Sequence, residues 1–256
     1  MRRLILAEYK KIFFLKFSRS YLGVIVIASM AFGILLSVTT PVTTGRYFRE
    51  LLPKEVLSMN LLGVDLVNIM LIVFTAMSIH REFSTRFIQV SLSLTPARMR
   101  YFAAKLLTYL GLSLILSVVT VFLAYCISQL LLLINGMPSL SLTEATTMRM
   151  LVGVMIMPVF YCLLTGAATF IFWSSAGAVT FALGVLATHT IVRLLPEGVQ
   201  LILLPLTPQS AIHNLAGMSQ PGSAEAVGLP VSAAVLIVWV VVTAVTGGWK
   251  LQGKDV

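Results

Sequence analysis

Residues 106–134 read LLTYLGLSLILSVVTVFLAYCISQLLLLI, without a single Asp, Glu, Lys, Arg or His. A helix needs ~20 mostly apolar residues to cross the hydrocarbon core of a bilayer, so this stretch is long enough to span a membrane. A strand of a transmembrane barrel would instead show ~10-residue segments of alternating polarity. The stretch is apolar on every side, and it therefore predicts a transmembrane helix.

Five further stretches are long and mostly apolar: residues 21–42, 60–79, 150–173, 176–195 and 231–249, of which the second contains Asp65 and the fourth contains His189 and Arg193. Over all 256 residues the chain is 58% hydrophobic and only 11% charged, whereas soluble domains are ~25% charged. So few charges could not cover the surface of a soluble globule. We therefore expect a single all-α integral membrane domain, residues 1–256, with six transmembrane helices.

The chain carries a net charge of +9, from 18 Lys and Arg against 9 Asp and Glu. If the N-terminus is cytoplasmic, thirteen of those basic residues lie in the terminal segments and the 80–105 connection. Lys and Arg accumulate in cytoplasmic loops, so the sequence predicts that both termini face the cytoplasm. Anionic headgroups then account for the basic charge, and we expect no nucleic-acid partner.

Residues 1–20 precede the first span and have a helical pattern of polarity. At 100° per residue, one side holds Ile5, Leu6, Tyr9, Ile12, Phe13 and Phe17, and the opposite side holds Arg3, Glu8, Lys10 and Lys11. A basic amphipathic helix lying in the headgroup plane has this pattern. The alternative is a plain positive-inside signal without a defined helix.

The connection over residues 80–105 reads HREFSTRFIQVSLSLTPARMRYFAAK. Apolar residues at helical spacing predict a cytoplasmic helix between the second and third spans: Phe83, Phe87, Val90 and Leu94. A strand-like alternation over residues 88–94 is the alternative. Thr95 and Pro96 then suit the start of the third helix, which would place Arg98, Arg100 and Lys105 at the headgroups.

The connection over residues 196–230 contains an apolar middle, residues 199–206, that is far too short to cross a bilayer. Pro205 and Pro208 interrupt it. A segment of this kind predicts a re-entrant or interfacial structure on the external side, with an ordered loop lying on the membrane as the alternative.

The sequence lacks the motifs of common catalytic sites. No G-x-x-x-x-G-K-[ST], H-E-x-x-H or G-x-S-x-G sequence occurs, so we expect no enzyme activity and no bound cofactor. His80, His189 and His213 fall far apart in the predicted topology, and we expect no metal site. Asp65 is the only carboxylate within an apolar stretch, about five residues from its outer end. Secondary carriers use ionisable groups near the midplane, so this arrangement disfavours a carrier.

Several charged and small residues allow two interpretations, one functional and one structural. Glu82 and Arg86 lie one helical turn apart and could meet a partner or form a solvated pair. Asp65 could meet a cationic substrate, or pair with Arg149 or Arg193. His189 and Arg193 share a face of the fifth span, where Arg193 could instead extend to the headgroups. A stripe of small residues on that span predicts close helix packing, either within the bundle or across a dimer: Thr180, Gly184 and Thr188.

The 80–105 connection resembles that of permease subunits of ABC-2 type exporters. The resemblance rests on Glu82, Ser84-Thr85-Arg86, Thr95-Pro96-Ala97-Arg98 and Ala104-Lys105. The N-terminal MRRLILAEYKKIFFLKFS, with Glu8 and Lys11, and the terminal Lys254-Asp255 also resemble this family. The sequence departs from the family pattern at Phe83-Ser84, directly after Glu82.

The resemblance implies a dimer of permease subunits, the same or homologous, with two ATP-binding subunits that hold the ATP. Contacts with those subunits would involve Glu8, Glu82, Phe83, Arg86 and Phe87. It further implies the bacterial plasma membrane, and export of an amphiphilic, peptide or drug-like substrate, as in antibiotic self-protection. Asp65, His189 and Arg193 are candidates for the substrate path. A secondary carrier and a non-transporting scaffold or sensor subunit are the alternatives.

Overall fold

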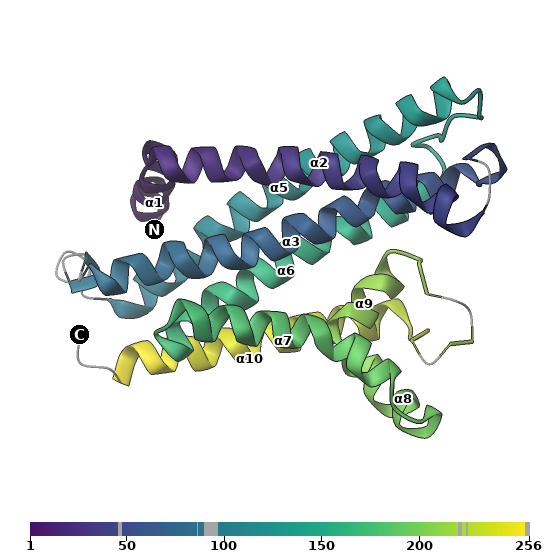
Figure 1. Cartoon of the computed structure of the whole chain (residues 1–256). Helices are drawn as coiled ribbons and strands as arrows, with labels where there is room; N and C mark the ends of the chain where they lie inside the picture. Colours follow the sequence, from purple (N-terminus) through teal and green to yellow (C-terminus); the bar gives the residue numbers. More distant parts are fainter. Residues whose placement is uncertain (46–47, 86, 90–96, 220–221, 224, 254–256) are drawn as a thin grey trace.

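The computed structural model describes residues 1–45, 48–85, 87–89, 97–219, 222–223 and 225–253, in which every regular element is a helix. Six helices are long and apolar enough to cross a membrane: α2 (Lys16–Thr44), α3 (Pro53–Ser84), α5 (Arg98–Ile134), α6 (Ala145–Phe172), α7 (Ser175–Arg193) and α10 (Leu229–Gly253). They run side by side along one axis (Figure 1). For the described part of the chain, the all-α class and the six helices of membrane-spanning length and composition are thereby confirmed.

Helices α3 and α6 form the centre of the bundle. Helix α3 packs against α2, α5, α6 and α7, and helix α6 packs against α3, α5, α7 and α10. Glycines allow close approach at two crossings. A Cβ on Gly63 of α3 would lie 2.4 Å from the Ser29 carbonyl oxygen of α2, and one on Gly247 of α10 would lie 2.8 Å from the Ala167 carbonyl oxygen of α6. Small residues serve membrane helices in this way because dispersion contacts replace the hydrophobic effect there.

Helix α3 is longer than its apolar stretch predicts. It begins at Pro53, a residue that suits the first helical position, and the Glu55 carboxylate accepts a hydrogen bond from the Leu52 N–H at 2.9 Å. The helix therefore has 32 residues, and Asp65 lies about three turns inside it. The prediction that Asp65 sits near an outer helix end is wrong, because the apolar stretch marks only part of the helix.

The chain's two ends lie at the same end of the bundle. Helix α1 (Arg2–Phe14) and the last turn of α10 lie there, together with the end of α3 and the start of α5 (Figure 1). We call this the termini end. The opposite end, here the far end, carries α8 (Glu197–Leu203) and α9 (Pro208–Leu215) together with two 3-10 turns, η1 (Phe48–Glu50) and η2 (Leu204–Leu206).

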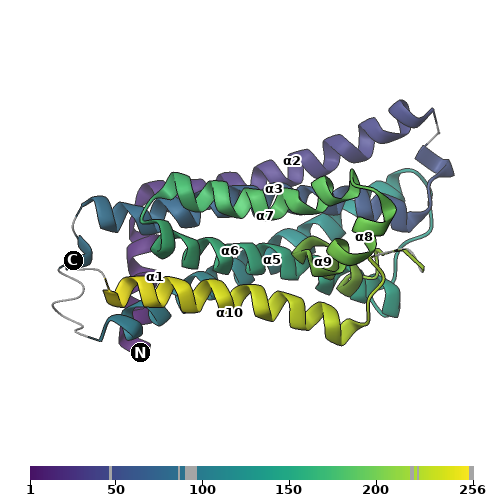
Figure 2. The ribbon, with the colours of Figure 1, turned by 90° about the horizontal axis from the view of Figure 1, so that it is seen from below.

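Helix α1 lies across the termini end, at a steep angle to the spans (Figure 2). It stops at Phe14 because Leu15 takes an extended conformation, with φ −75° and ψ 116°. Its buried side chains are Glu8 and Ile12. The prediction that Glu8 belongs to the outer polar face is therefore wrong. Several predicted apolar-face residues are not covered by other helices, among them Leu6 and Phe13.

The connection between α3 and α5 differs from the predicted layout. Helix α3 continues through Glu82 and Phe83 to Ser84, so both residues belong to a spanning helix rather than to a separate cytoplasmic one. Residues 87–89 are helical, whereas residues 86 and 90–96, with Arg86, Thr95 and Pro96, lie outside the described part of the chain. Helix α5 begins at Arg98 with Ala97 as its N-cap.

The predicted external segment, residues 196–230, contains α8, η2 and α9. Helix α8 has no buried residue, and its exposed side chains include Leu201 and Ile202. Helix α9 is instead packed against α6, α7 and α10. Its start is capped by the Thr207 hydroxyl, which accepts a hydrogen bond from the Ser210 N–H at 3.4 Å. An apolar exposed helix thus leads into a buried one.

Candidate functional site

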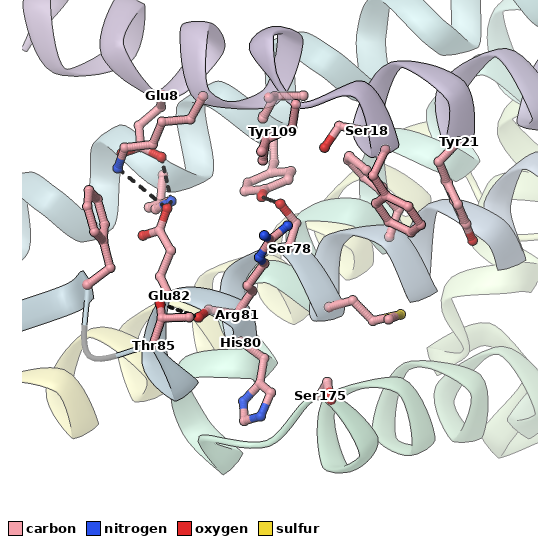
Figure 3. A pocket seen from close by; sticks show the side chains of 18 of the residues that line it. Glu8, Ser18, Tyr21, Ser78, His80, Arg81, Glu82, Thr85, Tyr109 and Ser175 are labelled. Atoms are coloured by element: carbon pink, nitrogen blue, oxygen red, sulfur yellow. Dashed lines mark hydrogen bonds and ion pairs between the residues drawn. The ribbon is translucent and has the colours of Figure 1, made fainter.

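A cavity of about 880 Å³ lies at the termini end, between α1 and α2 on one side and α3 on the other (Figure 3). Its wall is mostly apolar, with Phe17, Phe74 and Met77 among the lining residues. Charged side chains gather at one edge, with Glu8, Lys11, Glu82 and Lys105, and further polar groups, among them Ser18 and Tyr21, lie elsewhere in the lining. The cavity therefore combines an apolar wall with a charged edge, which suits an amphiphilic molecule.

Four charged residues form a cluster at this edge. The Lys105 ammonium group contacts the Glu8 carboxylate and lies 2.6 Å from Glu82 Oε1. Lys11 Nζ lies 2.6 Å from Glu8 Oε1 and 3.4 Å from Glu82 Oε1. Figure 3 shows Glu8 on α1 facing Glu82 on α3. Below, the charge cluster means Glu8, Lys11, Glu82 and Lys105.

The charge cluster is buried and electrically balanced. The Lys105 side chain is 2% exposed and that of Glu8 is 9% exposed. The Tyr101 hydroxyl donates a hydrogen bond of 2.6 Å to Glu82 Oε2, the oxygen that the two lysines leave open. Two ammonium groups therefore face two carboxylates. A buried charge is tolerated when it is paired and hydrogen-bonded in this way.

The charge cluster joins three elements at one point. Glu8 and Lys11 come from α1, Glu82 from α3 and Lys105 from α5. The segment that follows α3 reaches the same point, because Lys11 Nζ lies 4.8 Å above the centre of the Phe87 ring. Contacts of the charge cluster and of Phe87 therefore connect α1 and residues 87–89 to two of the long helices, α3 and α5.

The predicted contact residues divide between the inside and the surface. Glu8 and Glu82 point into the charge cluster, and Phe83 packs on Phe170 and Trp173, with ring centres 5.3 Å and 4.6 Å apart. Phe87 is 44% exposed at the cavity edge. Only Phe87 among these four thus presents a large apolar surface outward. Lys105, predicted at the headgroups, is buried instead because two carboxylates surround it.

Polar groups without partners lie near the middle of the bundle. Asp65 is half-buried and makes no hydrogen bond or ion pair with the described residues. Asn68, one turn further along α3, is fully buried, and neither its amide nitrogen nor its oxygen has a partner there. The buried Tyr161 hydroxyl of α6 also has no hydrogen-bond partner among the described residues. The predicted pairing of Asp65 with Arg149 or Arg193 does not occur, since Arg149 donates to the Asn214 and Leu215 carbonyl oxygens.

His189 and Arg193 belong to a second group of charged residues, at the far end. Arg193 Nε donates to Glu225 Oε1 at 2.8 Å, and His189 Nε2 lies 3.6 Å from the same oxygen. The rings of His189 and His213 lie 5.2 Å apart. Burial lowers the pKa of His213, although the Glu225 carboxylate partly opposes this shift. The expectation that the histidines lie far apart is wrong for this pair, because α9 folds back against α7.

Several residues of these groups have no signal in the sequence. Lys105 follows an apolar-aromatic run and resembles any basic residue at a helix start, and Tyr101 resembles an interfacial aromatic. Glu225 lies in a stretch rich in Gly, Ala and Ser without a pattern. Charge balance is the one indirect indication that the sequence offers. A buried Lys requires carboxylates nearby, and Glu8 and Glu82 are predicted near the same membrane face as Lys105.

Comparison with known proteins adds no relative: no protein-family model, no curated protein and no solved structure matches the chain.

Proposed function

We propose that the chain is the membrane-spanning permease subunit of an ATP-driven exporter of the ABC-2 type. Two such subunits, the same or homologous, would stand above two ATP-binding subunits on the cytoplasmic side of a bacterial plasma membrane. The substrate class would be amphiphilic, as for peptide or drug-like molecules, including antibiotics in self-protection. The family assignment rests on the sequence resemblance, and the geometry of the termini end supports it.

The charge cluster is the observation that carries the proposal. An exporter without its own ATP site must receive work through contacts with a partner. Here α1, α3 and α5 meet in one buried, balanced cluster, and Phe87 lies against Lys11 at its outer edge. A partner that engages Phe87 and α1 would therefore move two spans together. Arg86, between α3 and Phe87, is a further candidate contact.

The cavity at the termini end supports the substrate class. Pockets for drug-sized ligands measure about 300–1,000 Å³ and are mostly apolar with a few polar groups. The cavity of about 880 Å³, with Phe17, Phe74 and Met77 in its wall and the charge cluster at its edge, has these properties. In the proposed orientation it faces the cytoplasm, the side from which an exporter takes its substrate.

The external segment fits an exporter in which the far end closes the path. Helix α8 exposes Leu201 and Ile202, and η2 then turns the chain into the buried helix α9. In this proposal α8 dips into the outer leaflet as a re-entrant element. His189 and Arg193 lie beside α9 and would line the exit.

The proposal is tested by purifying the full chain from its native membranes in mild detergent. We expect an ATP-binding subunit to co-purify in equal amount, with ATPase activity that the chain alone lacks. An aromatic anchor in a partner pocket contributes ~2 kcal/mol or more, so Phe87→Ala should reduce co-purification by about tenfold or more. Phe122→Ala is the matched control, because Phe122 is 58% exposed on α5 yet lies far from the cluster along that helix. Absence of any ATP-binding subunit from the wild-type preparation would contradict the proposal.

A secondary carrier is the second candidate, and Asp65 favours it. The carboxylate lies near the middle of α3 rather than at its outer end, with the unpartnered Asn68 one turn away. Carriers place ionisable groups at this depth. If Asp65→Asn abolishes transport driven by an ion gradient in vesicles free of ATP, the carrier replaces the exporter.

A further inference from the structure

We propose that His189, His213 and Glu225 form a binding site for a divalent transition-metal ion of the zinc type at the far end of the bundle. One ligand atom from each residue lies within 4.8 Å of the other two. The three residues come from α7, from α9 and from the segment before α10. The site is separate from the charge cluster and does not depend on the proposed transport function.

The distances suit a shared ion better than direct hydrogen bonds. His189 Nε2 lies 3.6 Å from Glu225 Oε1, and His213 Nδ1 lies 3.9 Å from Glu225 Oε2. An N–H···O hydrogen bond measures ~2.7–3.2 Å, so neither contact is a good one. Two ligands of a tetrahedral zinc ion, each ~2.1 Å from the metal, lie about 3.4 Å apart. The two imidazoles face different oxygens of Glu225, so binding one ion between them requires a rotation of the carboxylate together with small side-chain movements.

The outer nitrogen of each imidazole already has a hydrogen-bonding neighbour. His189 Nδ1 lies 3.0 Å from the Ser210 hydroxyl oxygen, which leaves Nε2 to face Glu225. His213 Nε2 lies 3.1 Å from the Gln209 amide nitrogen, while the buried Gln209 amide oxygen has no partner among the described residues. Rotating that amide lets the oxygen accept the His213 Nε2–H, which leaves Nδ1 with its lone pair facing Glu225. Zinc-bound histidines are oriented by such outer partners.

The donor set selects the metal. Two imidazoles and one carboxylate suit zinc and its neighbours in the transition series, whereas calcium and magnesium prefer oxygen ligands throughout. Three protein ligands would leave a fourth position for water. His189 and Glu225 are 6% and 5% exposed, and the His213 side chain is 31% exposed, so an ion could enter past His213.

Arg193 is the competing cation. Its guanidinium group contacts Glu225 Oε1 through both Nε and Nη2, and its side chain is 56% exposed. This pairing occupies one carboxylate oxygen and leaves Oε2 available, so the guanidinium group and an ion could share the carboxylate. If the Arg193–Glu225 ion pair instead excludes the ion, the wild-type chain will bind no stoichiometric Zn²⁺.

The test uses the full chain, purified with a histidine-free tag and stripped with a chelator, and titrated with Zn²⁺. We expect one Zn²⁺ per chain and a raised melting temperature. His213→Ala should weaken binding by at least about 100-fold, since even outer partners of zinc ligands change affinity ~10–100-fold. His80→Ala is the matched control, because His80 lies on α3 at the termini end.

Two outcomes of the Zn²⁺ titration would overturn the proposal. The first is no stoichiometric Zn²⁺ binding by the wild-type chain. The second is equal weakening by His213→Ala and His80→Ala. Because His213→Ala could also disturb α9, Co²⁺ provides a second readout on the wild type: tetrahedral coordination gives intense visible absorption, and a weak octahedral spectrum would count against the site. Gln209→Ala should reduce Zn²⁺ affinity about tenfold, through the orientation of His213.

Discussion

Lys105 is the residue on which the charge cluster depends, because it contacts both carboxylates and is 2% exposed. Replacing it by Met keeps the length of the side chain and removes the charge. Glu8 and Glu82 would then face each other with only the partly exposed Lys11 between them. Breaking a buried ion pair costs ~3–5 kcal/mol, so we expect Lys105→Met to lower stability by about 3 kcal/mol, measured by unfolding of the purified chain in detergent.

Lys10→Met serves as the control, since Lys10 is exposed on the same helix α1 as Glu8. We expect a change of less than about 0.5 kcal/mol there. Equal stability of the two variants would mean that the charge cluster contributes nothing to the fold. Glu82→Lys would place three ammonium groups together and should destabilise the bundle as well.

The sequence singled out residues of this region as candidate contacts, but the structure places most of them against other helices of the same chain. Glu8, Glu82 and Phe83 were expected to face a partner, and they lie inside the protein instead. Residue spacing within one helix shows which side chains share a face. It does not show which other helix covers that face, and Glu8, Glu82 and Lys105 come from three elements that meet only in the folded chain. Phe87, which is not covered, is the predicted contact residue that the structure leaves available.

At the scale of the elements, glycines decide how closely α2 approaches α3. A Cβ at Gly63 would lie 2.4 Å from the Ser29 carbonyl oxygen, which belongs to the backbone and has no room to move within α2. Gly63→Ala should therefore force the two helices apart and cost about 1–3 kcal/mol, as overpacking does. Thermal unfolding in detergent measures the loss.

Gly184 on α7 is the matched control, because nothing lies within 4 Å of a Cβ added there. Gly184→Ala should be neutral or stabilise the chain by up to ~1 kcal/mol, the difference in helix propensity between the two residues. If both substitutions have the same effect, close packing at Gly63 is not a determinant of the α2–α3 crossing.

The same comparison narrows a sequence expectation. Thr180 and Gly184 of the predicted packing stripe are exposed on α7, so within the described chain they do not bring helices together, and packing against a second subunit stays a prediction. Gly63 and Gly247, on α3 and α10, are among the glycines that do lie close to a neighbouring helix. A small residue permits close approach, but neighbouring side chains on the partner helix determine whether the approach occurs.

Helix α8 is a second element whose position can be tested. Its side chains Leu201 and Ile202 are 64% and 69% exposed, and burying them in lipid is worth about 1.5–3 kcal/mol each. A spin label at Leu201→Cys should therefore be accessible to oxygen, which partitions into lipid, and protected from a water-soluble relaxation agent. A label at Ser139→Cys, in the exposed α5–α6 connection, should behave in the opposite way. Equal water accessibility at the two positions would exclude insertion of α8.

At the scale of the whole molecule, the number and order of the spans could be predicted from the sequence almost completely. Hydropathy over ~20 residues is dictated by bilayer thickness, and all six stretches became helices. The helix ends could not be predicted as well. Helix α3 extends beyond its apolar stretch on both sides, because Pro53 and Glu55 start it early and the charge cluster keeps Glu82 helical at its other end.

The arrangement of the ends gives the last prediction. The described structure places α1 and the last turn of α10 at the termini end, with Thr85 exposed there and Ser139 exposed at the far end. Of the thirteen basic residues that the sequence places on the cytoplasmic side, the eleven that the structure describes lie in segments of the termini end, and Lys and Arg are retained on the cytoplasmic side during insertion. In a chain without its native Cys126 and Cys162, a membrane-impermeant maleimide applied to intact cells should therefore label Ser139→Cys and not Thr85→Cys. Thr85→Cys should become reactive only after the membrane is opened. The reverse pattern would place α1, the charge cluster and Phe87 outside the cell, where no ATP-binding subunit could reach them, and the exporter proposal would fail together with the predicted orientation.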